Sequence, residues 1–274
     1  MPSLQSVIRP LHVLAGALGG AVFVHERRMR RRAERFAAAA LESLLRAIDA
    51  NDPRTGAHVR RVAEYALILT DALGIAERER RTIELAALFH DVGKIHEALF
   101  DILHEPGKLT AAEWRAIRTH PIRGAEVLAP IAHFHPRLAD AVLSHHERWD
   151  GKGYPRRLRG RRIPLSARVV SLADTFDVIT HGRRYRQGRA ASAAAAVIVQ
   201  GRGTQFDPDL VDLVLLPPVF ERLVEAHQEL SRRGEALLKR RESPGYEQAP
   251  NVEIRWRSRT GPPKPTREKM TAAR

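Results

Sequence analysis

The sequence contains no cysteine. Disulfide scaffolds, thiolate zinc sites and thiol nucleophiles are therefore excluded together. Aromatic residues make up only 5% of the chain, and no zinc-finger or RNP-like signature is present, so we expect no nucleic-acid polymer as a partner. Any metal in this protein must be held by carboxylates and by the histidines, of which there are 13.

Acidic residues are also in the minority, because 32 Asp and Glu stand against 46 Lys and Arg and leave a net charge of +14. A positive surface attracts anionic ligands, and without a polymer-binding module it favours a small phosphate-containing substrate. The hydrophobic content of 43% is ample for a core. The length of 274 residues allows one large domain or two small ones.

Residues 1–36 combine an apolar run with a cluster of arginines. The apolar run over residues 10–24 is shorter than the roughly 20 residues that a membrane helix needs. Residues 4–24 would reach that length only with Arg9 extended toward the interface. We therefore favour a cytoplasmic protein whose N-terminal helix packs on the domain, with membrane association through residues 4–24 as the alternative.

Residues 37–220 show helical periodicity, and no segment alternates as a half-buried strand would. Glycine and proline residues separate about seven or eight candidate helices with short connections. The pattern predicts an all-α domain built as a helical bundle. Residues 221–274 are expected to form a polar helix followed by a disordered basic tail, because the tail has little that could be buried.

Histidine and aspartate residues recur on or beside the helices of this bundle. Taken singly, His90 is explained as a hydrogen-bonded core residue and His120 as a capping or surface residue, but an ordinary helix terminus gives no reason for the inward pair His145-His146. Asp174, however, lies in a helix that is apolar nearly all round, where a carboxylate is unfavourable unless paired, protonated or bound to a metal. The set that suits two divalent ions, with Asp91 as the bridge, is His90, Asp91, His120, His145, His146 and Asp174. Mixed imidazole and carboxylate ligation favours iron, manganese or zinc over magnesium.

Five segments carry a family resemblance: HDVGK at 90–94, the His120-Pro121 pair, HHERWDGKGYP at 145–155, DTFD at 174–177 and GTQFDP at 203–208. In this order and spacing they resemble the HD-GYP family of the HD phosphohydrolase superfamily. The eleven-residue segment is highly specific, whereas a bare HD pair would be weak. The resemblance implies a bacterial signal-transduction enzyme with an all-α fold and a di- or trinuclear metal centre. It also implies hydrolysis of cyclic di-GMP to linear pGpG, sometimes on to GMP.

The resemblance further implies a role for each matching residue. One metal would be held by His90, Asp91 and Asp174, and the other by Asp91, His120, His145 and His146. Lys94 matches the lysine beside the scissile phosphate, which makes Asp91 and Lys94 the expected catalytic residues. The nucleotide contacts would come from Tyr154, Arg183 and Arg186, with Gly151 and Gly153 allowing the backbone to approach the ligand. Gly182 and Arg184 replace an acidic residue and a proline of the family, so substrate affinity or selectivity could differ.

His58 bears on the number of metals. Some family members use the matching histidine, with an acidic residue four positions earlier, to hold a third ion. Here the earlier position is Arg54, a fixed cation that cannot ligate a metal. We therefore expect two ions, iron or manganese, with His58 an outer residue or at most a weak ligand.

Two other readings stay open. The first is a signalling module that binds nucleotide or a partner protein without turnover, because residues 96–101 (HEALFD) depart from the usual turn of the family. The second is an HD hydrolase of another cyclic dinucleotide. Cyclic di-GMP is the expected ligand, and GGDEF-type proteins and a second copy of this chain are the candidate protein partners.

Overall fold

The structure, a computed structural model, describes residues 4–95, 110–183 and 186–241, with side chains over residues 23–95, 110–182 and 188–233. The chain divides into two units, residues 1–232 and 233–274. The first unit carries all of the candidate site that the structure describes. The basic tail predicted for residues 243–274 lies outside the described residues.

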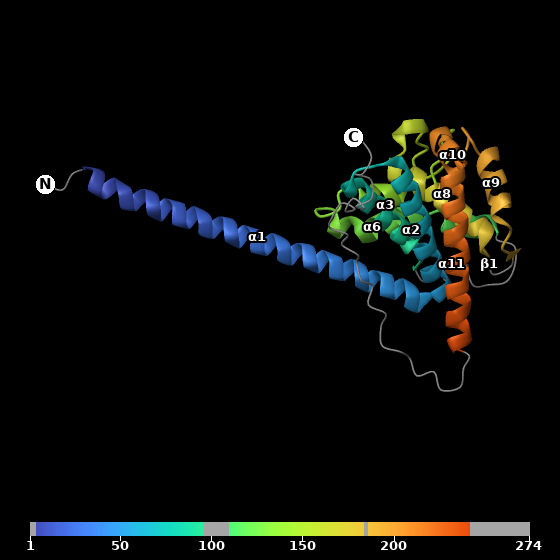
Figure 1. The fold of residues 1–274 in the computed structure, drawn as a ribbon, viewed down its shortest axis with the longest axis horizontal. Helices are drawn as coiled ribbons and strands as arrows, with labels where there is room; N and C mark the ends of the chain where they lie inside the picture. The colour runs from blue at the N-terminus through green and yellow to red at the C-terminus, as the bar shows by residue number, and fades with distance from the viewer. Residues whose placement is uncertain (1–3, 96–109, 184–185, 242–274) are drawn as a thin grey trace, which may run out of the picture. The chain divides into compact units, whose positions relative to one another are not determined.

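The described residues form a succession of helices (Figure 1). The α-helices are α1 (Leu4–Asn51), α2 (Pro53–Leu73), α3 (Glu77–Phe89), α5 (Ala111–Ile117), α6 (His120–Leu128), α7 (Leu138–Ser144), α8 (Leu165–Thr180), α9 (Ala191–Gln200), α10 (Pro208–Val214) and α11 (Pro217–Arg241). Short 3-10 helices are η1 (Val92–Ile95), η2 (Ala129–Ile131) and η3 (Gly160–Arg162). The predicted all-α class is confirmed.

Strand pairing within the described ranges is limited to a two-residue hairpin and one isolated bridge. Strands β1 (Gly182–Arg183) and β2 (Arg186–Gln187) pair antiparallel, with Arg183 opposite Arg186. The isolated bridge joins Arg202 and Phe206. Neither forms a layer of the fold.

The boundaries of α2 follow from its flanking residues. The Asp52 carboxylate accepts hydrogen bonds from the backbone N–H groups of Arg54 (3.0 Å) and Thr55 (3.2 Å), and Pro53 opens the helix. Gly74 ends it in the left-handed conformation, with φ of 63°, which glycine adopts without a steric penalty. The two caps set the start and the end of the helix that presents His58 to the site.

The hydrophobic core forms where α2, α3 and α8 pack on one another (Figure 1). Val62 of α2, Ile83 of α3 and Phe176 of α8 are fully buried there. The rings of Tyr65 and Phe176 meet edge to face with centroids 5.0 Å apart, an arrangement that aromatic pairs favour. α6 packs on α7 and on η1, which brings the ends of short helices toward this core.

The C-terminal part of α1 packs on α2 through Leu41, Leu45 and Ile48, which are buried. Upstream on the same helix, Phe23 and Phe36 are exposed. In the part of the chain that the structure describes, no helix combines the length and the apolar character needed to cross a membrane.

Candidate metal centre and substrate pocket

Three histidines of the site are oriented by the same local hydrogen bond to the backbone. His90 follows the last residue of α3, His120 begins α6 three positions after the last residue of α5, and His145 follows the last residue of α7. Each ring places Nδ1 within 2.6–2.8 Å of the backbone carbonyl oxygen three residues earlier. A carbonyl only accepts, so Nδ1 carries the proton and the lone pair of Nε2 points away from the backbone. The contact with the backbone at each helix end thereby fixes the orientation of the three imidazoles, with Nε2 free to bind a metal.

The Nε2 atoms of His120 and His145 lie 3.1 Å apart. With both protons on Nδ1, two lone pairs would face each other at this distance. A cation between them removes that conflict, and these rings are the donors that iron, manganese and zinc accept. The two histidines form one group with His146, whose ligand atoms all lie within 4.8 Å of one another.

A second group of possible ligands consists of His58, His90 and Asp174, again with ligand atoms within 4.8 Å of one another. His90 Nε2 and Asp174 Oδ1 are buried and have no hydrogen-bond partner among the described residues. Buried polar atoms are rarely left unpaired, so these atoms are suited to ligate a cation. The donor sets of both groups therefore suit divalent metals.

Asp91 lies between the two groups. Its Oδ2 is 3.4 Å from Nε2 of His90, and its Oδ1 is 3.3 Å from Nε2 of His120. Lys94, one turn later in η1, donates from Nζ to Asp91 Oδ2 at 2.7 Å. The carboxylate thus touches residues of both groups and the one lysine of the HDVGK segment.

The electrostatics of the site set protonation states that suit metal ligands. Burial, reinforced by the positive charge of Lys94, lowers the pKa of His120 to about 3, and burial lowers that of His146 to about 4. Burial opposes ionisation of Asp91, but Lys94 and His90 outweigh it and hold the pKa of Asp91 well below its usual range. Near neutral pH the imidazoles of His120 and His146 are neutral and the Asp91 carboxylate is charged.

His58 behaves differently from these histidines. Burial alone would lower its pKa, but the nearby carboxylates of Asp174 and Asp177 outweigh burial and raise it to about 9. Its Nε2 lies 3.3 Å from Asp174 Oδ1 and 3.9 Å from Asp91 Oδ2. The structure therefore brings His58 next to the candidate ligands. Its role as an outer residue or weak ligand stays a prediction.

The loop after α7 shapes the wall beside His146. The buried Glu147 carboxylate accepts hydrogen bonds from the backbone N–H groups of Arg156 (2.7 Å) and Leu158 (2.9 Å), which folds the loop back on itself. The Tyr154 ring consequently stacks on His146 with centroids 4.9 Å apart.

Glycine is required at positions 151 and 153 of this loop for different structural reasons. Gly151 has a φ of 79°, the left-handed region that glycine tolerates best. A Cβ on Gly153 would lie 2.4 Å from Arg148 N and 2.6 Å from the His146 carbonyl oxygen. The close approach at Gly153 is thus to the protein's own backbone.

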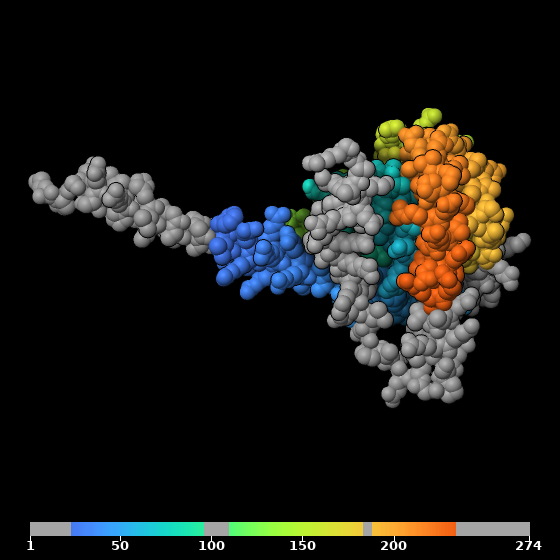
Figure 2. All heavy atoms as spheres, in the orientation of Figure 1, coloured from blue at the N-terminus to red at the C-terminus, as the bar shows by residue number. Residues whose placement is uncertain are grey.

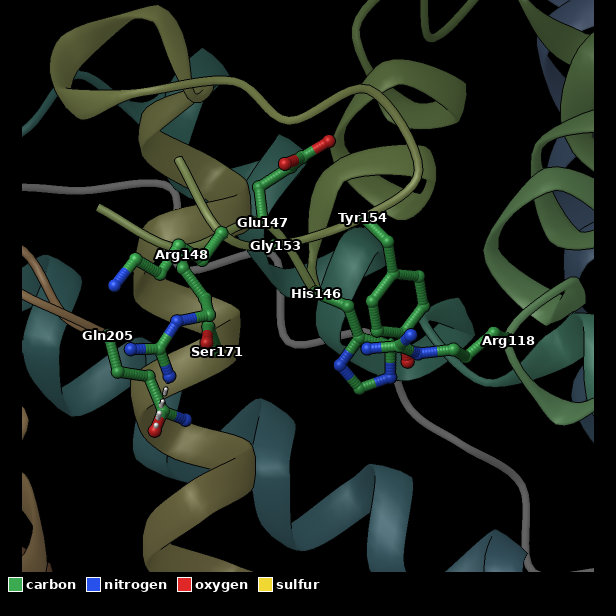
Figure 3. Close-up of a pocket in the computed structure, with 9 residues that line it drawn as sticks. Arg118, His146, Glu147, Arg148, Gly153, Tyr154, Ser171 and Gln205 are labelled. Atoms are coloured by element: carbon green, nitrogen blue, oxygen red, sulfur yellow. Dashed lines mark hydrogen bonds between the residues drawn. The ribbon is translucent and has the colours of Figure 1, made fainter. Parts of the chain in front are cut away.

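A cavity of about 180 Å³ opens beside His146 (Figure 3). Its lining residues are Arg118, His146, Glu147, Arg148, Lys152, Gly153, Tyr154, Ser171 and Gln205. The Arg118 guanidinium lies 4.7 Å from the centre of the Tyr154 ring, and Arg148 is paired with Asp150 at 2.8 Å. Figure 3 shows Arg118 beside His146 and Tyr154, and the Glu147 carboxylate turned away from them. The cavity is therefore cationic on the side of the metal-ligating candidates.

Some predicted site residues fall outside what the structure describes. The side chains of Arg183 and Arg186 lie outside the described residues, although their backbones pair in the β1–β2 hairpin. Arg184 and residues 96–101 lie outside them altogether.

Sequence reasoning also missed residues that the structure brings to the site. Arg118 stands two positions before His120, with no motif to mark it. Asp177 is the second carboxylate of the DTFD segment and is 1% exposed, yet only Asp174 was singled out there. The segment itself was the available signal for Asp177.

Comparison with known proteins identifies the fold and family. The model of the HD domain family matches residues 42–210. A 3'3'-cGAMP-specific phosphodiesterase 2 of Vibrio cholerae is 40% identical over 175 residues, covering 63% of this chain and 33% of the relative. A cyclic di-GMP phosphodiesterase response regulator of Xanthomonas campestris is 41% identical over 177 residues, covering 64% and 46%. The chain thus spans less than half the length of these two relatives.

Among solved structures, a cyclic GMP-AMP specific phosphodiesterase of V. cholerae matches with a TM-score of 0.52 at 21% identity, covering 70% of this chain and 52% of that one. This likeness supports the fold. The chain belongs to the HD domain family. Its HHERWDGKGYP segment and its curated relatives assign it to the HD-GYP branch of that family.

Proposed function

We propose that this protein is a metal-dependent phosphodiesterase that hydrolyses cyclic di-GMP to linear pGpG at a dinuclear histidine–aspartate centre. The observation that carries the proposal is the pair of Nε2 atoms of His120 and His145, 3.1 Å apart beside the buried carboxylate of Asp91. The cyclic di-GMP phosphodiesterases among the relatives support the substrate class.

The proposal assigns the ligands as the resemblance implies. One ion takes His90, Asp91 and Asp174, and the other takes Asp91, His120, His145 and His146. Iron or manganese fits this mixed donor set. When bound, such ions activate water and offset the negative charge of a phosphate.

Side chains around the centre would bind and orient the substrate. Lys94 is held at the centre by Asp91 and can donate a hydrogen bond to a phosphoryl oxygen or to the leaving 3′ oxygen. The stacked pair of His146 and Tyr154 forms a flat wall against which a nucleotide can lie. Arg118 and Lys152 line the adjoining cavity and attract the second phosphate, together with the proposed contacts Arg183 and Arg186.

We also propose that residues 37–220 form the catalytic domain and that the protein is located in the cytoplasm. GGDEF-type proteins are its candidate partners, and pairing with a second copy of this chain remains part of the proposal. Hydrolysis of pGpG on to GMP would use the same groups.

A second candidate substrate is 3'3'-cGAMP. The specific observation that favours it is the 40% and 37% identity to two cGAMP-specific phosphodiesterases of V. cholerae. Because both substrates present the same pair of 3′–5′ phosphodiesters, the metal centre would serve either. Selectivity would then come from groups that contact the bases.

The test is product analysis on the full chain, purified without oxygen and loaded with Mn²⁺ or Fe²⁺. Cyclic di-GMP and 3'3'-cGAMP are supplied separately and in competition, and the products are identified by mass spectrometry. We expect pGpG from cyclic di-GMP. Exclusive cleavage of 3'3'-cGAMP would favour the second candidate, and binding without a linear product would refute the enzyme. Asp207→Asn, which alters a buried carboxylate paired with Arg168, serves as the folded control.

A further inference from the structure

A buried carboxylate that the proposed mechanism leaves unused lies next to the metal centre. Asp177 follows Asp174 by three residues on α8, so both project from nearby positions on one helix. It is 1% exposed. Burial opposes its ionisation, but hydrogen bonds from His181, His58 and Arg61 outweigh burial and hold the pKa of Asp177 well below its usual range.

Both oxygens of Asp177 are engaged on two sides. Arg61 donates from Nε to Oδ1 at 2.7 Å and from Nη2 to Oδ2 at 2.9 Å, the fork that fixes a carboxylate plane. His181 Nδ1 lies 3.1 Å from Oδ1. The remaining contact, 2.7 Å long, joins Oδ2 to Nδ1 of His58. The carboxylate therefore has little freedom to rotate.

That last contact determines how His58 faces the site. An ionised carboxylate only accepts, so Nδ1 of His58 holds a proton and Nε2 is the atom left to face Asp174 and Asp91. Ligating histidines commonly donate their second ring nitrogen to a carboxylate, which fixes both the tautomer and the ring orientation. The contact between Asp177 and His58 has this form.

The residues that hold Asp177 in place come from, or reach, three helices. Arg61 lies one turn after His58 on α2, so the helix that presents the imidazole also anchors the carboxylate that orients it. His181 at the end of α8 reaches Ser231 of α11, with its Nε2 3.2 Å from the Ser231 Oγ. Figure 2 shows the described side chains of α11 at the surface, so the group extends from the centre to an outer helix.

We propose that Asp177, held by Arg61 and His181, is a positioning residue that keeps Nε2 of His58 directed at the carboxylates of Asp174 and Asp91. The inference rests on the proposed metal centre and concerns metal affinity, not the identity of the nucleotide. By this reasoning Asp177 acts through His58 alone.

The test measures binding of Mn²⁺ itself to the full chain, by titration with electron paramagnetic resonance detection of free Mn²⁺. Asp177→Asn keeps the shape but removes the negative charge and replaces one of the two acceptor oxygens with an NH2 donor, so Arg61 and His58 can no longer both be satisfied as they are now. It should raise the Kd of at least one Mn²⁺ ion by about 10- to 100-fold. The matched control is Asp207→Asn, which weakens a buried carboxylate–arginine pair that touches no candidate ligand, and its Kd values should stay within about twofold of the wild type.

A second comparison separates positioning from general destabilisation. His58→Gln alone should weaken Mn²⁺ binding to a similar extent, and adding Asp177→Asn to it should change the Kd no further. Wild-type Mn²⁺ affinity in folded Asp177→Asn protein, or losses that multiply in the double variant, would overturn the inference.

Should Asp177→Asn fail to fold, Arg61→Lys keeps the charge but removes the two-bond fork, and it should still raise the Kd several-fold. An unchanged Kd in that variant would also overturn the inference. None of these measurements uses a nucleotide. A wild-type protein that binds Mn²⁺ but cuts no cyclic dinucleotide would therefore refute the proposed function alone, whereas one that binds no Mn²⁺ would overturn this inference.

Discussion

Substitution of Gly93 by alanine tests how closely the His90-Asp91 segment must approach His120 at the start of α6. Gly93 lies in η1, directly after the His90-Asp91 pair, and η1 packs on the start of α6. A Cβ at this position would lie 2.1 Å from the carbonyl oxygen of His120 and 2.6 Å from Gly124 N. Its φ is not in the left-handed region, so the obstacle is steric contact with backbone atoms.

Real Cβ contacts essentially never fall below 3.0 Å, so the backbone at His120 must move away by about 0.9 Å. That shift would separate His120 from Asp91, whose facing atoms are now 3.3 Å apart. A misplacement of about 1 Å in a catalytic group can cost on the order of 100-fold in rate, equal to about 2.7 kcal/mol in the barrier. Overpacking should also lower the free energy of unfolding by about 1–3 kcal/mol.

The assay is the kcat for cyclic di-GMP with saturating Mn²⁺, alongside metal content and thermal unfolding. Gly124→Ala is the matched control, because its Cβ would meet only side-chain tips under 3.4 Å, at 3.0 Å from Val142 Cγ1 and 3.3 Å from Val92 Cγ1. These tips can yield, so the control should lose less than about tenfold. A folded Gly93→Ala protein with full metal content and kcat within about threefold of the wild type would refute the reasoning.

Three further predictions concern the centre and its cavity. Asp91→Ala should abolish hydrolysis and lower the Mn²⁺ content, since the proposed bridge contacts both groups; near-normal turnover with full metal occupancy would contradict the bridge. Arg118→Ala should raise KM for cyclic di-GMP by about one to two decades with metal content unchanged, because a charge-assisted contact contributes roughly 1.5–3 kcal/mol. An unchanged KM would remove Arg118 from substrate binding. Finally, the metal-free protein should lose stability as pH falls from 6.5 to about 4, because His120 and His146 stay neutral when folded but gain protons when unfolded. The slope is up to about 1.4 kcal/mol per pH unit for each histidine, and a flat denaturation midpoint over this range would contradict it.

The sequence alone predicted the helical class and which residue types gather at the site. Helical periodicity is a local property, so the inward face of α3 could be read from Ile83 and Ala87, both of which are buried. The absence of cysteine restricted metal donors to histidine and carboxylate. The short motifs identified the family, because their residues are close together along the chain.

Tertiary structure decided how those residues face one another. His120 and His145 are 25 positions apart, and only the packing of α6 on α7 brings their Nε2 atoms to 3.1 Å. The contact between His58 and Asp177 spans 119 positions and joins α2 to α8. Local sequence patterns carry no information on such distances, since they depend on where whole helices dock.

The roles of Arg118 and Gly93 also depend on how distant helices dock, so the sequence did not reveal them. Arg118 belongs to the cavity only because the loop after α7 folds back and sets Tyr154 beneath its guanidinium. Gly93 is not required by its backbone conformation. A side chain is excluded there because the backbone of His120, from another helix, lies too close for a Cβ. The sequence determined the chemistry available to this protein, and the docking of helices distant in the chain decided which atoms meet.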